Sequence, residues 1–131
     1  MFLSPSWDAH THDPAQFRHL PQALERVFTA LEKGDRLTVH GDYDADGITG
    51  STVLISTLQE IERRLTGRER RDSAVDYYIP HRDKEGYGIH KATVATLKDR
   101  GTKVLVTVDC GISCVEEVAL ARKADMDVIV V

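Results

Sequence analysis

Apolar runs of strand length alternate along this chain with longer segments that have the spacing of amphipathic helices. The runs rich in β-branched residues lie at about 36–40, 76–79, 104–109 and 127–131. Helical stripes precede them, at about 21–34, 51–65, 90–100 and 114–124. This order predicts an α/β fold, in which right-handed crossovers place helices on both faces of a parallel sheet of at least four strands.

Composition narrows the class of protein. With 131 residues and 41% hydrophobic content, the chain can bury one core, so we expect an N-terminal arm over 1–18 and one domain portion over 19–131. Apolar runs stay well short of the ~18 residues of a membrane span, and no signal peptide is visible, which predicts a soluble, cytoplasmic protein without a membrane partner. Cys110 and Cys114 are interpreted as reduced thiols, since they lack zinc-site spacing.

The segment His40–Thr49 (HGDYDADGIT) places three aspartates at alternate positions directly after the first predicted strand. Carboxylate oxygens are hard ligands, so Asp42 and Asp46, or Asp44 and a neighbour, can converge on Mg²⁺ or Mn²⁺. The helix that follows is expected over 51–65, with Thr49 or Ser51 as its cap. Its first N–H groups and its dipole would favour a phosphate beside the aspartates.

Other interpretations of this segment were weighed against the rest of the chain. A calcium EF-hand fails, because Val53 occupies the position of the bidentate glutamate and a strand precedes Asp42 where a helix should lie. A phosphatase of the haloacid dehalogenase type, with Asp44 as nucleophile and Asp46 as general acid, stays open on this motif alone. A solvated acidic turn without function is disfavoured, since closely spaced aspartates repel one another unless a cation is present.

Two further motifs follow predicted strands in the same way. One is the segment 79–88 (IPHRDKEGYG), in which His81 and Arg82 are candidates for substrate contact, Arg82 through its bidentate fork and His81 as a pH-dependent donor. The other is the segment 108–113 (VDCGIS), which begins with Asp109 at the end of its strand. Because ligands bind at the carboxyl ends of parallel strands, all three motifs are expected to share one site.

With these three strings in the same order, the sequence resembles the DHH phosphoesterase superfamily, and most closely its single-stranded-DNA exonuclease branch. The resemblance implies two divalent cations, Mn²⁺ or Mg²⁺, with Asp44, Asp46 and Asp109 as catalytic metal-binding aspartates. It gives Asp109 the bridging position, makes Asp42 a supporting ligand, and leaves His40 between ligand and strand-end residue. The family's Asp-His-His motif would follow the strand at 127–131, so the expectation is an incomplete DHH domain, inactive alone.

The function implied is metal-dependent hydrolysis of single-stranded DNA in the 5′ to 3′ direction, with repair and recombination proteins as inherited partners. The net charge of −4 argues against a chain that coats nucleic acid by bulk attraction, although bound metals would neutralise the aspartates. Two alternatives stay open. One is a DHH phosphoesterase acting on oligonucleotides, cyclic dinucleotides or pyrophosphate, and the other is a fragment that binds a partner without catalysis.

Overall fold

The computed structural model describes residues 3–131 of the chain. Its body alternates four helices with four strands, as the apolar pattern predicts. Their bounds are α2 Leu20–Lys33, β1 Leu37–Gly41, α3 Ala45–Thr66, β2 Val75–Tyr78, α4 Lys91–Asp99, β3 Val104–Val108, α5 Val115–Lys123 and β4 Asp127–Val130. The one-turn helix α1 (Trp7–His10) and a 3₁₀ turn at Pro14–Gln16 precede the body, and a second 3₁₀ turn, Arg70–Asp72, leads into β2.

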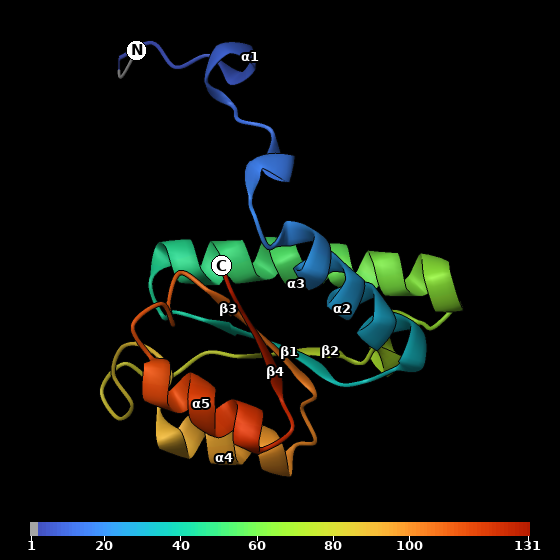
Figure 1. Ribbon diagram of the computed structural model, residues 1–131, viewed down its shortest axis with the longest axis vertical. Coiled ribbons are helices and arrows are strands. Elements are labelled where there is room, and N and C mark those ends of the chain that lie inside the picture. The colour runs from blue at the N-terminus through green and yellow to red at the C-terminus, as the bar shows by residue number, and fades with distance from the viewer. Residues whose placement is uncertain (1–2) are drawn as a thin grey trace.

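The four strands form one parallel sheet with the order β2-β1-β3-β4. Helices α2 and α3 cover one face of this sheet, and α4 and α5 cover the other (Figure 1). Because β1 and β3 are neighbours with Gly41 opposite Val108, the segments that leave these two strands start side by side. The prediction of an α/β fold with a parallel sheet of at least four strands is confirmed.

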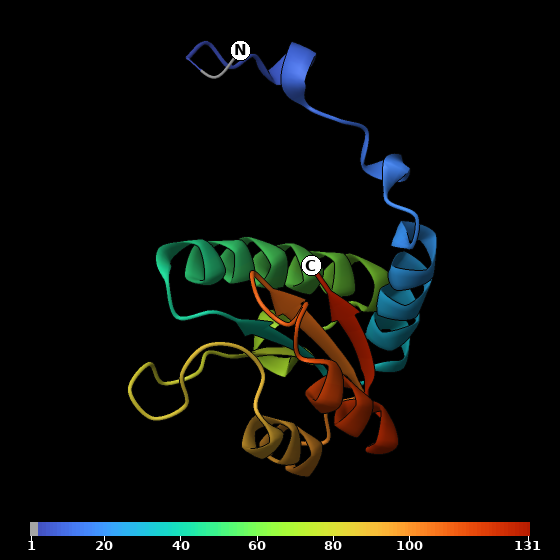
Figure 2. The ribbon, with the colours of Figure 1, turned by 60° about the vertical axis from the view of Figure 1, so that its left-hand side comes forward.

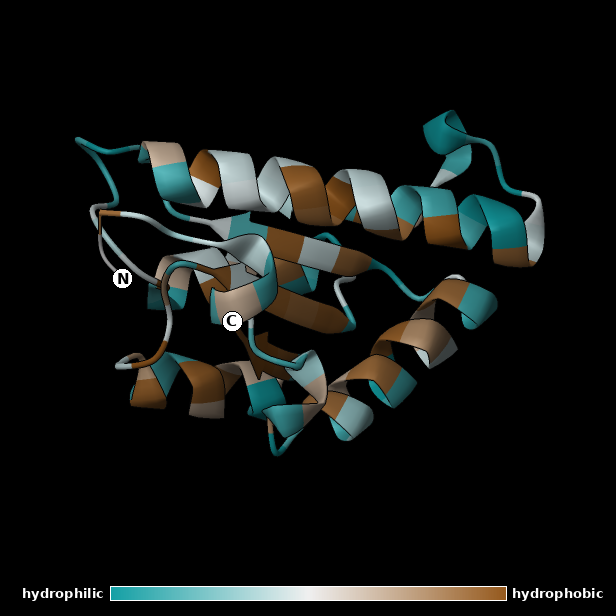
Figure 3. Ribbon diagram, turned by 90° about the horizontal axis from the view of Figure 1, so that it is seen from above, coloured by the Kyte–Doolittle hydropathy of each residue, from teal (hydrophilic) through white to brown (hydrophobic). Residues whose placement is uncertain are grey.

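Each face of the sheet has its own apolar core. The core under α2 and α3 contains Leu31, Val39 and Val106, and the core under α4 and α5 contains Leu97 and Leu105. Alternate residues of the strands point to opposite faces, which is why Leu105 and Val106 lie in different cores. Figure 3 shows brown, apolar colour concentrated on the central strands, with brown and teal alternating along the helices. This is the pattern of a sheet buried on both faces.

Helix α3 begins six residues earlier than the sequence predicts, at Ala45 in place of Ser51. The Asp44 side chain caps it, because Oδ1 accepts a hydrogen bond of 2.9 Å from the Gly47 N–H. Thr49 and Ser51, the expected caps, lie inside the helix, and the Thr49 hydroxyl donates to the Ala45 carbonyl at 2.7 Å. The second half of the segment His40–Thr49, which we call the acid motif, therefore forms the first turn of α3 and not a separate loop before it.

The arginine-rich segment from the last turn of α3 to the start of β2 forms contacts within the chain. Glu62, 1% exposed, accepts from Arg68 Nη1 at 2.9 Å, from the Ala74 N–H at 3.2 Å and from the Ser73 hydroxyl. The remaining arginines of this segment also find partners within the chain: Arg63 and Arg64 on Glu60, Arg70 on Gln59, and Arg71 on Asp72. This segment thus joins the end of α3 to the start of β2.

Replacing Glu62 with alanine should lower the free energy of unfolding by about 2 kcal/mol, since three donors lose their acceptor in a buried place. Glu60→Ala is the matched control on the same helix, because its partners are exposed and the pair contributes little. Urea denaturation of both variants measures the difference. Equal stabilities would contradict the structural role given to Glu62.

The N-terminal arm leaves the body before α2. Figures 1 and 2 show it extending away from the sheet in both views. The Trp7 and Phe17 side chains are 82% and 73% exposed. Within residues 3–131, no helix combines the length and the apolar character required to cross a membrane.

Candidate functional site

Asp42 follows β1 directly and lies inside the protein. Its backbone N–H donates to the Val108 carbonyl at 3.3 Å, which extends the pairing of β1 with β3 by one residue. Its side chain is 4% exposed, and Oδ1 has no hydrogen-bond partner among residues 3–131. A buried carboxylate oxygen without a donor is costly, and a cation is the partner that suits it. This oxygen is the observation in the structure that points most directly to a metal.

Glycine at position 47 lets α3 approach this carboxylate. A Cβ on Gly47 would lie 2.6 Å from both the backbone nitrogen and the carbonyl oxygen of Asp42, so only glycine fits. Asp44 and Asp46 flank the contact in the first turn of α3, and both are exposed. Asp44 uses one oxygen for the helix cap. The N-terminus of α3, with its first N–H groups, follows the end of β1 after three residues.

Asp109 follows β3 in a backbone conformation that few residues adopt. Its φ is 58°, in the left-handed region, where Asp and Asn are tolerated better than most side chains. The Tyr87 hydroxyl donates to the Asp109 carbonyl at 3.0 Å, and the Thr107 hydroxyl donates to the Cys110 carbonyl at 2.8 Å. These two bonds fix the turn, and with it the direction in which the exposed Asp109 side chain leaves the sheet.

The fold brings the three motifs to the carboxyl-terminal end of the sheet, as expected. It does not assemble a complete metal cluster there. No group of three carboxylate, imidazole or thiol side chains within residues 3–131 is arranged to hold a metal ion. The carboxylates at this end of the sheet are the hard donors that Mg²⁺ and Mn²⁺ prefer, and one oxygen of Asp42 is without a partner in the described structure, so the residues fit such an ion as part of a ligand set. The ligand assignments stay predictions.

His40 lies at the end of β1 with its side chain fully buried. Its Nδ1 is 3.5 Å from Cys110 Sγ, its ring stacks on Tyr78 with centroids 5.5 Å apart, and Nε2 has no partner among the described residues. Burial lowers the pKa of His40 below its usual 6.5 and raises the pKa of Cys110 to about 11, so both groups are uncharged at neutral pH. A neutral imidazole keeps the lone pair that a metal ligand requires.

The lowered pKa of His40 predicts a pH dependence of stability. The unfolded chain binds a proton on His40 near pH 6.5 and the folded chain does so only at lower pH, so stability is full above pH 6.5 and falls as the pH drops below it. Urea denaturation at pH 7.5 and 5.0 should therefore show a smaller loss for His40→Gln than for wild type. His12→Gln, in the exposed arm, should keep the wild-type loss; if it matched His40→Gln, the assignment would be wrong.

The segment 79–90 carries the predicted substrate residues and is tied down at several points. Glu85 accepts from the His81 N–H at 2.8 Å and from the Tyr78 hydroxyl, and these bonds lower the pKa of Glu85 in that order of importance. His81 Nδ1 accepts from the Asp83 N–H at 3.2 Å. His81 thus stabilises the turn through its hydrogen bonds with Glu85 and Asp83. Substrate contact by His81 stays a prediction.

Arg82, unlike His81, makes its contact outside the segment 79–90. Its Cζ lies 4.8 Å from the centroid of the Tyr43 ring, in a cation–π contact that joins the segment to the acid motif. Sequence reasoning missed Tyr43, although an aromatic residue between two aspartates was the available signal.

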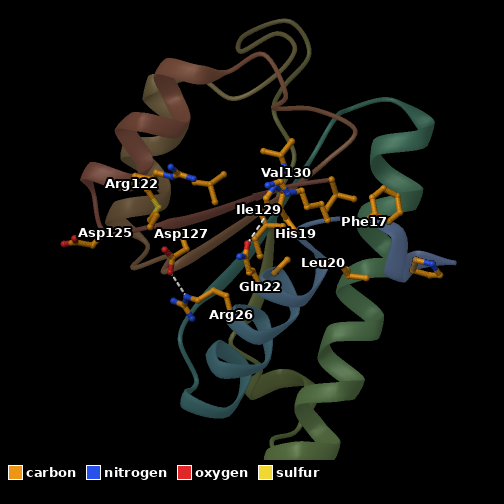
Figure 4. A pocket seen from close by; sticks show the side chains of 16 residues that line it. Phe17, His19, Leu20, Gln22, Arg26, Arg122, Asp125, Asp127, Ile129 and Val130 are labelled. Atoms are coloured by element: carbon orange, nitrogen blue, oxygen red, sulfur yellow. Dashed lines mark hydrogen bonds and ion pairs between the residues drawn. The ribbon is translucent and has the colours of Figure 1, made fainter. Parts of the chain in front are cut away.

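A large groove lies elsewhere in the molecule. It has a volume of about 1580 Å³ and runs beside β4, between the start of α2 with Phe17 and Leu20 and the strand residues Ile129 and Val130 (Figure 4). None of the predicted site residues lines it. The groove is therefore separate from the edge where the acid motifs meet.

Known proteins similar in sequence share this architecture. The model of the DHH family, N-terminal domain, matches residues 36–131. The single-stranded-DNA-specific exonuclease RecJ of Bacillus subtilis is 36% identical over 123 residues, which are 94% of this chain and 14% of that protein. RecJ of Escherichia coli is 35% identical over 115 residues, 88% of this chain and 18% of that protein.

A solved structure gives the same relation in three dimensions. The crystal structure of exonuclease RecJ bound to manganese superposes with a TM-score of 0.72 at 34% identity, over 86% of this chain and 26% of that one. The chain thus spans 14% and 18% of the lengths of the two relatives named above. The match over 36–131, with the parallel sheet and the three motifs at its edge, shows that the chain belongs to the DHH family and is similar to the corresponding part of RecJ.

Proposed function

We propose that this chain forms part of the metal-dependent catalytic centre of a single-stranded-DNA-specific exonuclease similar to RecJ. Such an enzyme would act 5′ to 3′, in the cytoplasm, in DNA repair and recombination. The buried Oδ1 of Asp42, which has no partner in the described part of the chain, lies at the end of the sheet from which Asp109 also emerges, and this oxygen is the observation that carries the proposal. The relatives named for single-stranded DNA and the similar structure bound to manganese support the substrate class and the use of a divalent cation.

Asp44, Asp46 and Asp109 would hold two divalent cations, Mn²⁺ or Mg²⁺, with Asp42 and His40 as further ligands. When bound, such ions lower the pKa of a water molecule and neutralise charge on a phosphodiester. The chain's own contribution is to orient these carboxylates: the cap to Gly47 fixes Asp44, and the left-handed turn fixes Asp109.

Substrate phosphate would meet two positive groups of the chain at this edge. The first turn of α3 offers N–H groups and the positive end of its dipole. The Arg82 guanidinium offers a planar fork that suits phosphate oxygens. The helix turn belongs to the acid motif, and Arg82 contacts that motif through Tyr43.

The isolated chain should bind Mn²⁺ but not degrade DNA, because its described residues do not complete a metal site. The test is a chimera in which this chain replaces the matched segment of Bacillus subtilis RecJ. We expect the chimera to degrade 5′-labelled single-stranded DNA in the presence of Mn²⁺, and Asp109→Asn to lower that rate by about a hundredfold or more. Parental RecJ is the positive control. A folded chimera without metal-dependent activity, or full activity of Asp109→Asn, would contradict the proposal.

A further inference from the structure

Arg82 differs in its contacts from most arginines of this protein. Arg26, Arg36, Arg63, Arg64, Arg68 and Arg71 form ion pairs with carboxylates, and Arg70 donates to Gln59. The Arg82 guanidinium has neither an ion pair nor a hydrogen bond among residues 3–131, although Asp83 and Glu85 are close to it in the sequence. Its recorded contact in the described structure is with the face of the Tyr43 ring, at 4.8 Å. Among the described residues Arg100 also lies over an aromatic ring, that of Tyr78, at 5.3 Å.

This contact holds the guanidinium without using its donors. A carboxylate partner would occupy the N–H edge of arginine, whereas an aromatic ring attracts the flat face of the cation and leaves the edge free. Tyr43 lies between Asp42 and Asp44, and it is half-buried while Arg82 is exposed. The free N–H edge is therefore presented beside the carboxylates of the candidate metal site.

The backbone around Arg82 is fixed on both sides, so the contact does not depend on a swinging loop. Lys84 and Glu85 donate their N–H groups to the His81 carbonyl at 3.1 and 2.9 Å, and the His81 N–H donates to the Glu85 carboxylate at 2.8 Å. Further along, the Tyr87 hydroxyl binds the Asp109 carbonyl. The turn that carries Arg82 is thus attached both to itself and to the Asp109 segment.

We infer that Tyr43 is a positioning residue, whose ring aligns Arg82 so that its N–H edge donates hydrogen bonds to a phosphate group of a single-stranded oligonucleotide. The inference rests on the proposed function and adds a residue to it. Pre-alignment saves the side-chain entropy that a free arginine loses on binding, which raises affinity without a new contact to the ligand.

The experiment measures the affinity of the chain for a fluorescein-labelled, 5′-phosphorylated oligothymidine by anisotropy at low salt with Mn²⁺. Tyr43→Leu should weaken binding about threefold, the size of an exposed cation–π contact. Tyr43→Phe and Tyr43→Trp keep a π face and should restore the affinity. Tyr77→Leu removes an exposed tyrosine outside the site and serves as the matched control.

The decisive comparison is made in the Arg82→Gln background. Arg82→Gln should weaken binding and reduce the salt dependence by about 0.7 in the slope of log affinity against log salt, as for one lost phosphate contact to a single strand. Adding Tyr43→Leu to Arg82→Gln should then have no further effect, since the ring acts only through the arginine. An equal loss in both backgrounds, or an unchanged affinity of Tyr43→Leu, would overturn the inference.

Failure of the proposed function gives a different result. A wild-type chain that binds neither Mn²⁺ nor the oligothymidine contradicts the proposed function, and the role of Tyr43 falls with it. A wild-type chain that binds both, with Tyr43→Leu equal to it, contradicts the role of Tyr43 alone. Urea denaturation of each variant separates loss of folding from loss of affinity, and the Phe and Trp variants keep the test valid if the leucine variant does not fold.

Discussion

Asp44→Asn should lower the affinity of this chain for Mn²⁺ on the order of a hundredfold. Even residues that merely orient a metal ligand contribute 10- to 100-fold in affinity, and the loss of a ligand should cost at least as much. Asparagine is the informative substitution, because it keeps an oxygen that can cap α3 through the Gly47 N–H while removing the charge. Alanine would combine the loss of a ligand with the loss of about 1 kcal/mol of helix capping.

Isothermal titration with Mn²⁺ measures the effect, and Asp99→Asn controls for the change in net charge, since Asp99 is exposed at the end of α4. An unchanged Mn²⁺ affinity in Asp44→Asn would show that Asp44 is a helix cap and not a ligand. A covalent aspartyl-phosphate on Asp44 would instead support the dehalogenase-type interpretation of the acid motif.

Gly47→Ala should destabilise the chain by about 3 kcal/mol, although alanine normally stabilises a helix by about 1 kcal/mol relative to glycine. The sign reverses because the new Cβ would lie 2.6 Å from two backbone atoms of Asp42, and this backbone, bonded to Val108, cannot move aside as a side chain can. Relief of this clash would displace the Asp42 backbone and with it the Asp42 carboxylate, so the affinity for Mn²⁺ should fall together with stability.

Gly50→Ala is the matched comparison three residues further along α3. There the Cβ would approach only the Val108 Cγ1 methyl group, at 2.9 Å, which a rotation of the valine relieves. Urea denaturation should place this variant within about 1 kcal/mol of wild type. If Gly47→Ala were as stable as Gly50→Ala, the close approach of α3 to Asp42 would not exist in solution.

The fold was predictable because apolar periodicity alone distinguishes these strands from these helices. The start of α3 was not, since Gly47 and Gly50 indicate a loop to any local rule. Glycine weakens a helix, but here close packing against Asp42 requires it. The strand before the acid motif excludes an EF-hand, as the sequence indicated. At the first turn of α3, the tertiary contact between Gly47 and Asp42 thus outweighed the low helix propensity of glycine.

The sequence predicted where the candidate site lies in the fold, but not how its side chains are arranged. Strand ends mark where the three motifs meet, but no sequence rule gives the left-handed backbone of Asp109 or the burial of Asp42. The stacking of Arg82 on Tyr43 joins residues 39 positions apart, and it depends on how the turn after β2 folds back. Such contacts are set by packing between segments, which a pattern within one segment does not contain.

The order of the strands also determines which part of this protein opens last. β1 and β3 each hydrogen-bond to two neighbours, whereas β2 and β4 each have one in the described sheet. Amide hydrogens of β1 and β3 should therefore exchange with solvent most slowly, and those of β2 and β4 sooner. Asp42 and Asp109 directly follow this slowly exchanging pair of strands. The two strands that carry the candidate site should therefore stay hydrogen-bonded to each other while β2 and β4 open locally.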